Sequence, residues 1–270
     1  SHGNCLKQLR ILVREWYLRT GGECQGRNSH KYLGSDNFEK DIFVKINIAE
    51  KLDEYLTNNN LKNNIINLGG VCDSYQEVER EYRLMPDVLK VLIKHKQPTI
   101  ITTKSAFIIK DLALIEELSN SAEYVNTALT ITNVKKNVTS NLEAGASSPQ
   151  ERFEALKMLK GKSMYTALHF MPILPYFSDD KDSLETIVKW ASEADVDYML
   201  SGMLYLTKNI KPGYYKFLEE YYPEYLEKYK GLYKNGGAAK AYKSKIHKKL
   251  ADLRNKYDVN NSYSKFLPNR

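Results

Sequence analysis

Cysteine is scarce in this chain, with three residues among 270, at positions 5, 24 and 72. Three scattered cysteines cannot form the disulfide framework that stabilises many small secreted proteins. A reducing, cytoplasmic setting is therefore the expectation.

Long apolar runs are also absent. No stretch of about 18 consecutive apolar residues occurs, so the sequence predicts no membrane span. The short apolar run at 9–13 is surrounded by arginine and glutamate and does not resemble a signal peptide. Internal repeats of fixed period and low-complexity tracts are missing too. What remains is a composition ordinary for a globular protein, with 42% hydrophobic and 27% charged residues.

Positive charge is in moderate excess, at +7 overall with a pI near 9.0, which permits nucleic-acid contact without requiring it. Much of the excess lies in one helix-like segment near the C-terminus: Lys240, Lys243, Lys245, Lys248, Lys249 and Arg254. The segment has two interpretations. It is either a solvated amphipathic helix, which is the commoner case, or a surface that follows a phosphate backbone. Tyrosines cluster just before it, and packing between C-terminal helices is the commoner explanation for them.

Short apolar runs in the middle of the chain predict β-strands at 65–68, 99–101, 124–129, 165–170 and 198–203. An alternating segment at 41–47 predicts one more. Segments of helical periodicity lie at 48–56, 85–95 and 150–159, and the chain becomes helical after residue 207, at 214–229 and 238–257. Strands that alternate with helices imply βα units and a parallel sheet, so the expected fold class is α/β.

Polar residues follow the ends of these strands, where parallel sheets bind their ligands. Gly69 and Gly70 follow the first core strand, and paired glycines let the backbone approach a ligand closely. Asp73 in the same loop is a candidate to hold a hydroxyl or ammonium group. Lys104 follows the second strand and is either a solvated lysine or a charge partner for a substrate carboxylate.

The third strand leads into another polar segment, which begins with Thr130. Further along, Ser148 can cap a helix with Glu151 as the acid of a capping box. Capping leaves Glu143 and Arg152 unexplained, and these two could form an ion pair at the rim of the crevice.

Two histidines are less distinctive. His169 lies in an apolar strand, where a core histidine with satisfied hydrogen bonds is commoner than a ligand. His30 lies in a loop near Cys24, where a surface residue is commoner than a metal ligand.

Several segments also occur in a characteristic order along the chain. They are Cys24 with 27–34 and 42–47, then 70–76 with Glu79, Tyr82, Arg83 and Leu84, then 101–105, 142–152 and 171–175. In this combination they resemble the radical SAM superfamily, and within it the spore photoproduct lyase-like branch. The resemblance covers about residues 24–259.

The resemblance implies both a fold and a chemistry. In that superfamily three cysteines spaced Cys-x3-Cys-x2-Cys hold a 4Fe-4S cluster, whose open iron binds S-adenosylmethionine. An electron from an external donor cleaves the cofactor, and the 5′-deoxyadenosyl radical abstracts hydrogen from the substrate. The implied fold is a partial (β/α)6 TIM-like barrel at 41–206, preceded by a cluster-binding-like segment at 1–40 and followed by a C-terminal helical extension at 207–270.

The candidate cofactor site collects the glycines, the residues that the resemblance implies and the possible ion pair. It comprises Gly69, Gly70, Cys72, Asp73, Lys104, Thr130, Glu143, Arg152 and Met171.

The cysteine motif departs from the family pattern. If Cys24 is its last cysteine, Tyr17 and Gly21 occupy the other two positions. A second alignment places Cys5 in the motif, with the first ligand before residue 1 and an insertion at 6–23. Cys24 and Cys5 are therefore the candidate metal ligands, and the chain either lacks its beginning or carries a degenerate cluster site.

The leading hypothesis is a radical SAM enzyme of the lyase type that acts on nucleic acid by analogy with the branch. No cysteine follows Cys72, although spore photoproduct lyase uses a late cysteine as hydrogen donor, so repair of thymine dimers is not expected. The alternative is a cluster-free, degenerate barrel that binds nucleic acid or a small molecule. The sequence leaves the substrate, the electron donor and the oligomeric state open.

Overall fold

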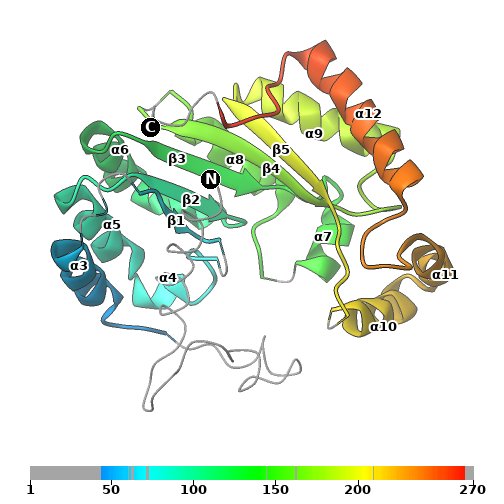
Figure 1. The fold of residues 1–270 in the computed structure, drawn as a ribbon, viewed down its shortest axis with the longest axis horizontal. Helices are drawn as coiled ribbons and strands as arrows, with labels where there is room; N and C mark the ends of the chain where they lie inside the picture. Colours follow the sequence, from blue (N-terminus) through cyan, green and yellow to red (C-terminus); the bar gives the residue numbers. More distant parts are fainter. Residues whose placement is uncertain are drawn as a thin grey trace.

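The computed structural model describes residues 44–59, 61, 64–70, 73–143, 145–161, 163–208 and 210–264. Within these residues one parallel sheet has the order β1-β2-β3-β4-β5, so each strand pairs with the next one in the sequence (Figure 1). The strands are β1 (Ile66–Leu68), β2 (Thr99–Thr103), β3 (Val125–Thr130), β4 (Tyr165–Ile173) and β5 (Tyr198–Met203). An open parallel sheet with this order is consistent with a partial TIM-like barrel, which confirms the predicted fold class.

Helices connect the strands and extend the chain beyond them. They are α3 (Ile48–Asn58), α4 (Glu79–Tyr82), α5 (Met85–Lys94), the 3₁₀ helix η1 (Ala106–Asp111), α6 (Leu112–Ser121), α7 (Lys136–Leu142), α8 (Pro149–Leu159), α9 (Lys181–Glu193), α10 (Lys211–Tyr221), α11 (Pro223–Leu232) and α12 (Lys240–Tyr257). None of the described helices is long and apolar enough to cross a membrane.

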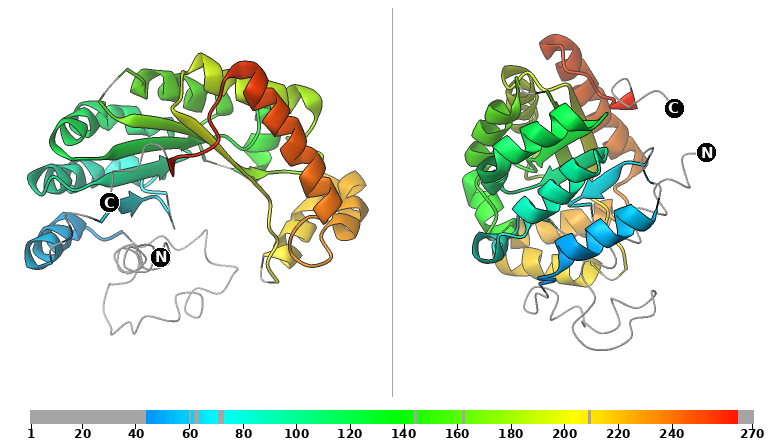
Figure 2. Two further views of the ribbon diagram at one scale, coloured as in Figure 1. Left: turned by 45° about the horizontal axis from the view of Figure 1, so that its top comes forward. Right: turned by 90° about the vertical axis from the view of Figure 1, so that its left-hand side faces the viewer.

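Strand residues alternate between two faces of the sheet, because successive side chains of a strand point to opposite sides. Leu129 and Leu168 join the main core with residues of α3, α5, α6, α8, α9 and α12. Figure 2 shows these helices gathered on one side of the curved sheet. Ala128, Ala167 and Tyr198 form a separate cluster. We call the helix-covered side the outer face and the opposite side the inner face.

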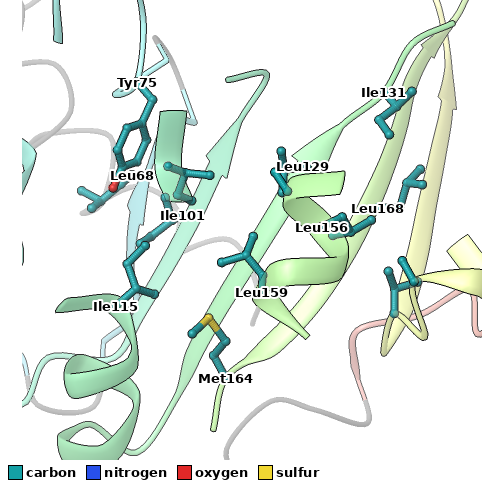
Figure 3. Close-up of a cluster of buried hydrophobic side chains, with 14 of the residues drawn as sticks. Leu68, Tyr75, Ile101, Ile115, Leu129, Ile131, Leu156, Leu159, Met164 and Leu168 are labelled. Carbon is teal, nitrogen blue, oxygen red and sulfur yellow. The ribbon is translucent and has the colours of Figure 1, made fainter. Parts of the chain in front are cut away.

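Aliphatic side chains fill the outer face. Leu129, Ile131 and Leu168 lie around α8 together with its Leu156 and Leu159 (Figure 3), and all of them are fully buried. Burial of one such side chain contributes about 1.5–3 kcal/mol. This packing fixes the strand ends from which the functional loops depart.

The C-terminal helices build a second cluster. Tyr229 of α11 is fully buried, packs with Leu218 of α10, and donates a hydrogen bond of 2.8 Å from its hydroxyl to the carbonyl oxygen of Pro175. The chain then returns along α9, where Ile246 and Leu250 of α12 enter the main core. The prediction that the tyrosine cluster serves helix packing is confirmed for Tyr222, Tyr225, Tyr229 and Tyr233, whereas Tyr221 is 51% exposed.

The strand predicted at 41–47 is wrong for its described part. Residues 44–47 lie outside any strand and lead through a turn into α3. Ile46, one of the apolar residues of the alternation, is 73% exposed. The spacing of Ile48, Leu52 and Leu56 over two turns of α3 places all three in the core, and this helical pattern begins where the alternation ends.

The single helix predicted at 214–229 is also wrong. Two helices occupy this segment, α10 and α11, and they meet at Tyr222. Pro223 lacks a backbone N–H and disfavours a helical conformation in the residue before it. The proline therefore ends one helix and opens the next at its first position.

Gly69 yields the first testable prediction, because its φ is +85° and a Cβ there would lie 1.8 Å from the carbonyl oxygen of Thr102. We expect Gly69→Ala to lower the free energy of unfolding by at least about 1–2 kcal/mol, since alanine meets both a left-handed backbone and a clash with β2. Urea unfolding followed by circular dichroism measures the change.

Gly231→Ala is the matched control. Gly231 lies within α11 with open space around its Cα, so alanine there is expected to be neutral or to stabilise by up to about 1 kcal/mol. Equal stability of the Gly69→Ala protein and the wild type would contradict the close approach of β1 and β2.

Candidate functional site

The predicted site residues lie where the strands end. All five strands are parallel, so their C-terminal ends share one edge of the sheet (Figure 1). The loops after β1, β2 and β3 and the end of β4 carry the described residues of the predicted set. Cys72 lies outside the described residues.

The loop after β1 is closely fitted to its neighbours. Gly69 lies against the backbone of Thr102, and a Cβ on Gly70 would lie 2.9 Å from Nδ2 of Asn67. The Asn67 Oδ1 atom is buried and has no hydrogen-bond partner among the described residues. Sequence analysis missed Asn67, although a polar residue inside a three-residue core strand was the available signal.

Asp73 ties the loop after β1 to the loop after β2. Its carboxylate accepts hydrogen bonds from Thr103 Oγ1 at 2.6 Å, from the backbone N–H of Lys104 at 2.7 Å and from the backbone N–H of Tyr75 at 3.0 Å. The described contacts of this carboxylate are thus with the protein itself. A direct contact between Asp73 and a cofactor stays a prediction.

Lys104 carries a charge in this region for which the described residues supply no ion-pair partner. Its backbone is fixed by Asp73, its side chain is half-buried, and its ammonium makes no ion pair within the described residues. A lysine in that state is suited to bind a carboxylate of a ligand.

Glu143 and Arg152 form the ion pair that the sequence predicts. Arg152 Nη2 lies 2.7 Å from Glu143 Oε2, as an ion pair rather than an aligned hydrogen bond. The guanidinium also donates to the carbonyl oxygens of Thr130 at 3.0 Å and Ser147 at 2.7 Å, while Thr132 Oγ1 donates to Glu143 at 3.1 Å. The pair lies deeper than a rim, since Arg152 is 1% exposed.

The capping box predicted ahead of α8 is confirmed. Ser148 Oγ accepts a hydrogen bond from the backbone N–H of Glu151, and the Glu151 carboxylate accepts one from the backbone N–H of Ser148. Capping starts α8 at Pro149 and places Arg152 in the first turn, directed back toward β3.

Thr130 and Met171 lie on neighbouring strands. Thr130 is paired with His169 across β3 and β4, and Met171 follows two residues later, where the pairing of β4 with β5 becomes irregular. Pro172 cannot donate a backbone hydrogen bond, which accounts for an irregularity at this place. Met171 is half-exposed and lies against Gly202 of β5.

His169 corrects one expectation. The sequence favoured a core histidine with satisfied hydrogen bonds, but the Nε2 atom is buried and has no partner among the described residues. Burial lowers the pKa of His169 to about 4, so its imidazole is neutral at pH 7.

The candidate metal ligands Cys5 and Cys24, as well as His30, lie outside the described residues. Within the part of the chain that is described, no group of three histidine, cysteine or acidic side chains is placed to hold a metal ion.

Comparisons with known proteins bear on the family and the fold of the chain. No family model matches the chain. An uncharacterized protein of Mycobacterium tuberculosis is 26% identical over 239 residues, which cover 87% of this chain and 70% of that protein. An uncharacterized protein of Methanocaldococcus jannaschii is 26% identical over 180 residues, which cover 67% of this chain and 64% of the relative.

Two similar solved structures belong to radical SAM enzymes. A mutant spore photoproduct lyase with bound AdoMet (S-adenosylmethionine) and dinucleoside spore photoproduct has a TM-score of 0.57 at 12% identity, covering 84% of this chain and 69% of that one. SuiB of Streptococcus suis has a TM-score of 0.51 at 13% identity, covering 79% of this chain and 42% of SuiB. The chain thus spans less than half of SuiB, and at these identities the likeness shows that the fold is the one these enzymes use.

Arg152 supplies a prediction on stability. We expect Arg152→Met to lower the free energy of unfolding by roughly 3–5 kcal/mol, because it leaves the Glu143 carboxylate without its cation. The control is Lys157→Met, which breaks an exposed pair with Glu154 and is expected to change stability by about 0–1 kcal/mol. Similar losses in the two variants would show that the Arg152 pair is not buried in solution.

His169 predicts a dependence of stability on pH. Its pKa of about 4 in the folded state lies below the ordinary value of about 6.5, so the unfolded chain binds the proton more readily between these values. The neutral imidazole of His169 therefore makes its full contribution to the free energy of unfolding above pH 6.5. That contribution is lost as the pH falls toward 4, by about 3 kcal/mol in total.

Urea unfolding of the wild type and of His169→Gln at pH 7, 5.5 and 4.5 isolates this contribution, because other groups titrate in both proteins. The difference between the two proteins should change by about 2.4 kcal/mol between pH 7 and pH 4.5. Parallel pH profiles would refute the buried neutral imidazole.

Proposed function

We propose that this chain is a radical SAM iron–sulfur protein, an enzyme of the lyase type that binds S-adenosylmethionine at the C-terminal edge of its sheet. The observation that carries the proposal is the fold shared with spore photoproduct lyase, combined with unpaired polar groups at that edge. When bound, the cluster and cofactor would supply a 5′-deoxyadenosyl radical that abstracts a hydrogen atom.

The described residues fit S-adenosylmethionine by their chemistry. Its methionyl end carries an ammonium and a carboxylate close together. Asn67 offers a buried oxygen that can accept from the ammonium, and Lys104 offers a cation for the carboxylate. Gly69 and Gly70 keep the loop between them free of side chains.

Other residues of the edge have positioning roles. Asp73 holds the backbone of Lys104 through a hydrogen bond of 2.7 Å. Arg152 and Glu143 hold the end of β3 at Thr130. Thr130, with Met171 on the next strand, is then available to the nucleoside part of the cofactor, and Cys72 is proposed to contact the cofactor as well.

The cluster ligands are proposed from the sequence alone. Cys24 and Cys5 are the candidates, with small thiols or a further cysteine completing the iron coordination, and an external donor supplying the electron.

Anaerobic reconstitution with iron and sulfide tests the proposal. The expected result is broad absorbance near 400 nm that changes on addition of S-adenosylmethionine, and loss of that absorbance in Cys24→Ala. A chain that stays colourless and binds no S-adenosylmethionine would refute it.

Lys104 allows a finer prediction. We expect Lys104→Ala to weaken S-adenosylmethionine binding roughly 10- to 100-fold in calorimetry, the effect of losing one hydrogen bond between charged groups. Lys110→Ala is the control, because Lys110 is an exposed lysine of the adjoining helix η1. Equal affinities of the two variants would place the carboxylate elsewhere.

One observation favours a second candidate, a cluster-free barrel that binds nucleic acid. Some surface lysines pair with acids, as Lys90 does with Asp87 and Lys230 with Glu227, and others are unpaired but scattered. On α12, five lysines at 240, 243, 245, 248 and 249 make no ion pair within the described residues. Salt-sensitive DNA binding by a colourless chain would support this candidate, whereas a radical SAM enzyme with a nucleic-acid substrate requires both the DNA binding and the cluster.

A further inference from the structure

The described strands place no formal charge on the inner face of the sheet, and Lys104, which follows β2 directly, is a cation at its edge. None of the five described strands contains aspartate, glutamate, lysine or arginine. The inner-face residues of β3 are Asn126, Ala128 and Thr130, and β4 adds Ala167 and His169, which is neutral at pH 7. This face is polar enough to form hydrogen bonds, yet it offers no counterion.

His169 is one of three residues on this face with a buried polar atom that lacks a hydrogen-bond partner among the described residues, the others being Asn67 and Asn126. It is 8% exposed, and its Nε2 atom has no hydrogen-bond partner among the described residues. A buried polar atom without a partner destabilises a protein, so such atoms are rare and call for an explanation. Nothing in the catalytic scheme or in the packing of the outer face uses this imidazole.

The surroundings of His169 limit what it can bind. The Tyr198 ring lies beside the imidazole, with ring centres 6.3 Å apart, and the Tyr198 hydroxyl donates to Asn126 at 3.2 Å. Ala128 and Ala167 lie opposite each other on the same face and pack with Tyr198. An anion beside His169 would lose its hydration and find no cation on the described strands, which is costly, whereas an uncharged group loses little.

We propose that His169 is a substrate-positioning residue whose Nε2 atom hydrogen-bonds an uncharged amide-type group, bound against the inner face beside the Tyr198 ring. A carboxamide, a peptide amide and the imide edge of a nucleobase share this chemistry. The inference rests on the proposed function, because it names the class of substrate that the proposed enzyme would bind. The binding it describes needs neither cluster nor cofactor.

Matched probes that differ only in charge test the proposal. Nicotinamide and nicotinate have the same ring and shape, but only the first is uncharged at pH 7. Titration of the full chain is followed by nitrogen NMR of its labelled histidines, with the His169 signals assigned from their absence in His169→Gln. Nicotinamide should shift the Nε2 resonance of His169 saturably, and nicotinate should not.

Uracil and N-acetylglycinamide then distinguish the two sources of the amide. A shift of His169 with either one supports the proposal and identifies a nucleobase or a peptide as the source. Equal binding of nicotinate, or no response of His169 to any uncharged probe, overturns it.

Two substitutions separate binding from structure. We expect His169→Phe to bind nicotinamide about 2- to 10-fold more weakly, the effect of one hydrogen bond, and to unfold at no lower urea concentration than the wild type. His169→Gln keeps a hydrogen-bonding group and should retain more of the affinity. A His169→Phe protein that is clearly less stable would show that the imidazole has a structural partner, and would overturn the proposal.

The proposed function and this inference fail separately. S-adenosylmethionine binding by calorimetry on the same samples reports on the first, and the response of His169 reports on the second. Cofactor binding without an amide response rejects the inference alone, whereas an amide response without cofactor binding or cluster rejects the radical SAM assignment alone.

Discussion

A single buried guanidinium determines how the C-terminal edge of the sheet is assembled. Arg152 reaches from the first turn of α8 to the carbonyl oxygens of Thr130 and Ser147 and to the carboxylate of Glu143. A charge removed from water requires partners on every side, because leaving one unpaired is strongly destabilising. The end of β3, the end of α7 and the start of α8 must therefore converge on one point.

A charged side chain, here a carboxylate, also fixes the loops after β1 and β2. The Asp73 carboxylate accepts from Tyr75, Thr103 and Lys104, so two loops that are 30 residues apart in sequence share one anchor. Both charged anchors bond mainly to the protein itself. A few polar groups at this edge have no partner among the described residues, and they include the Lys104 ammonium and the Asn67 oxygen. The division between anchors and free groups is what gives the edge the character of a binding site.

Local patterns explain which features could be predicted from sequence. The five strands and the capping box at Ser148 depend on neighbouring residues, and they are where the sequence places them. The Glu143–Arg152 pair could be predicted because capping accounted for every other charged residue between them. The partners of Asp73 could not, since they come from a different loop. Nor could the state of His169, because whether a strand histidine is satisfied depends on the side chains of the adjoining strands.

Alternation along the strands assigns different tasks to the two faces of the sheet. The outer face is closed by leucine and isoleucine against helices and contributes stability. The inner face keeps asparagine, threonine and histidine, which contribute little stability when unpaired. A sequence shaped by stability alone would place an apolar side chain at position 169, where the imidazole is buried without a partner. A bound group that hydrogen-bonds the imidazole would offset the cost of keeping a neutral histidine there. Because no residue of the described strands supplies a counterion, the proposed group is an uncharged one, and the charged parts of a ligand are left to Lys104 at the edge.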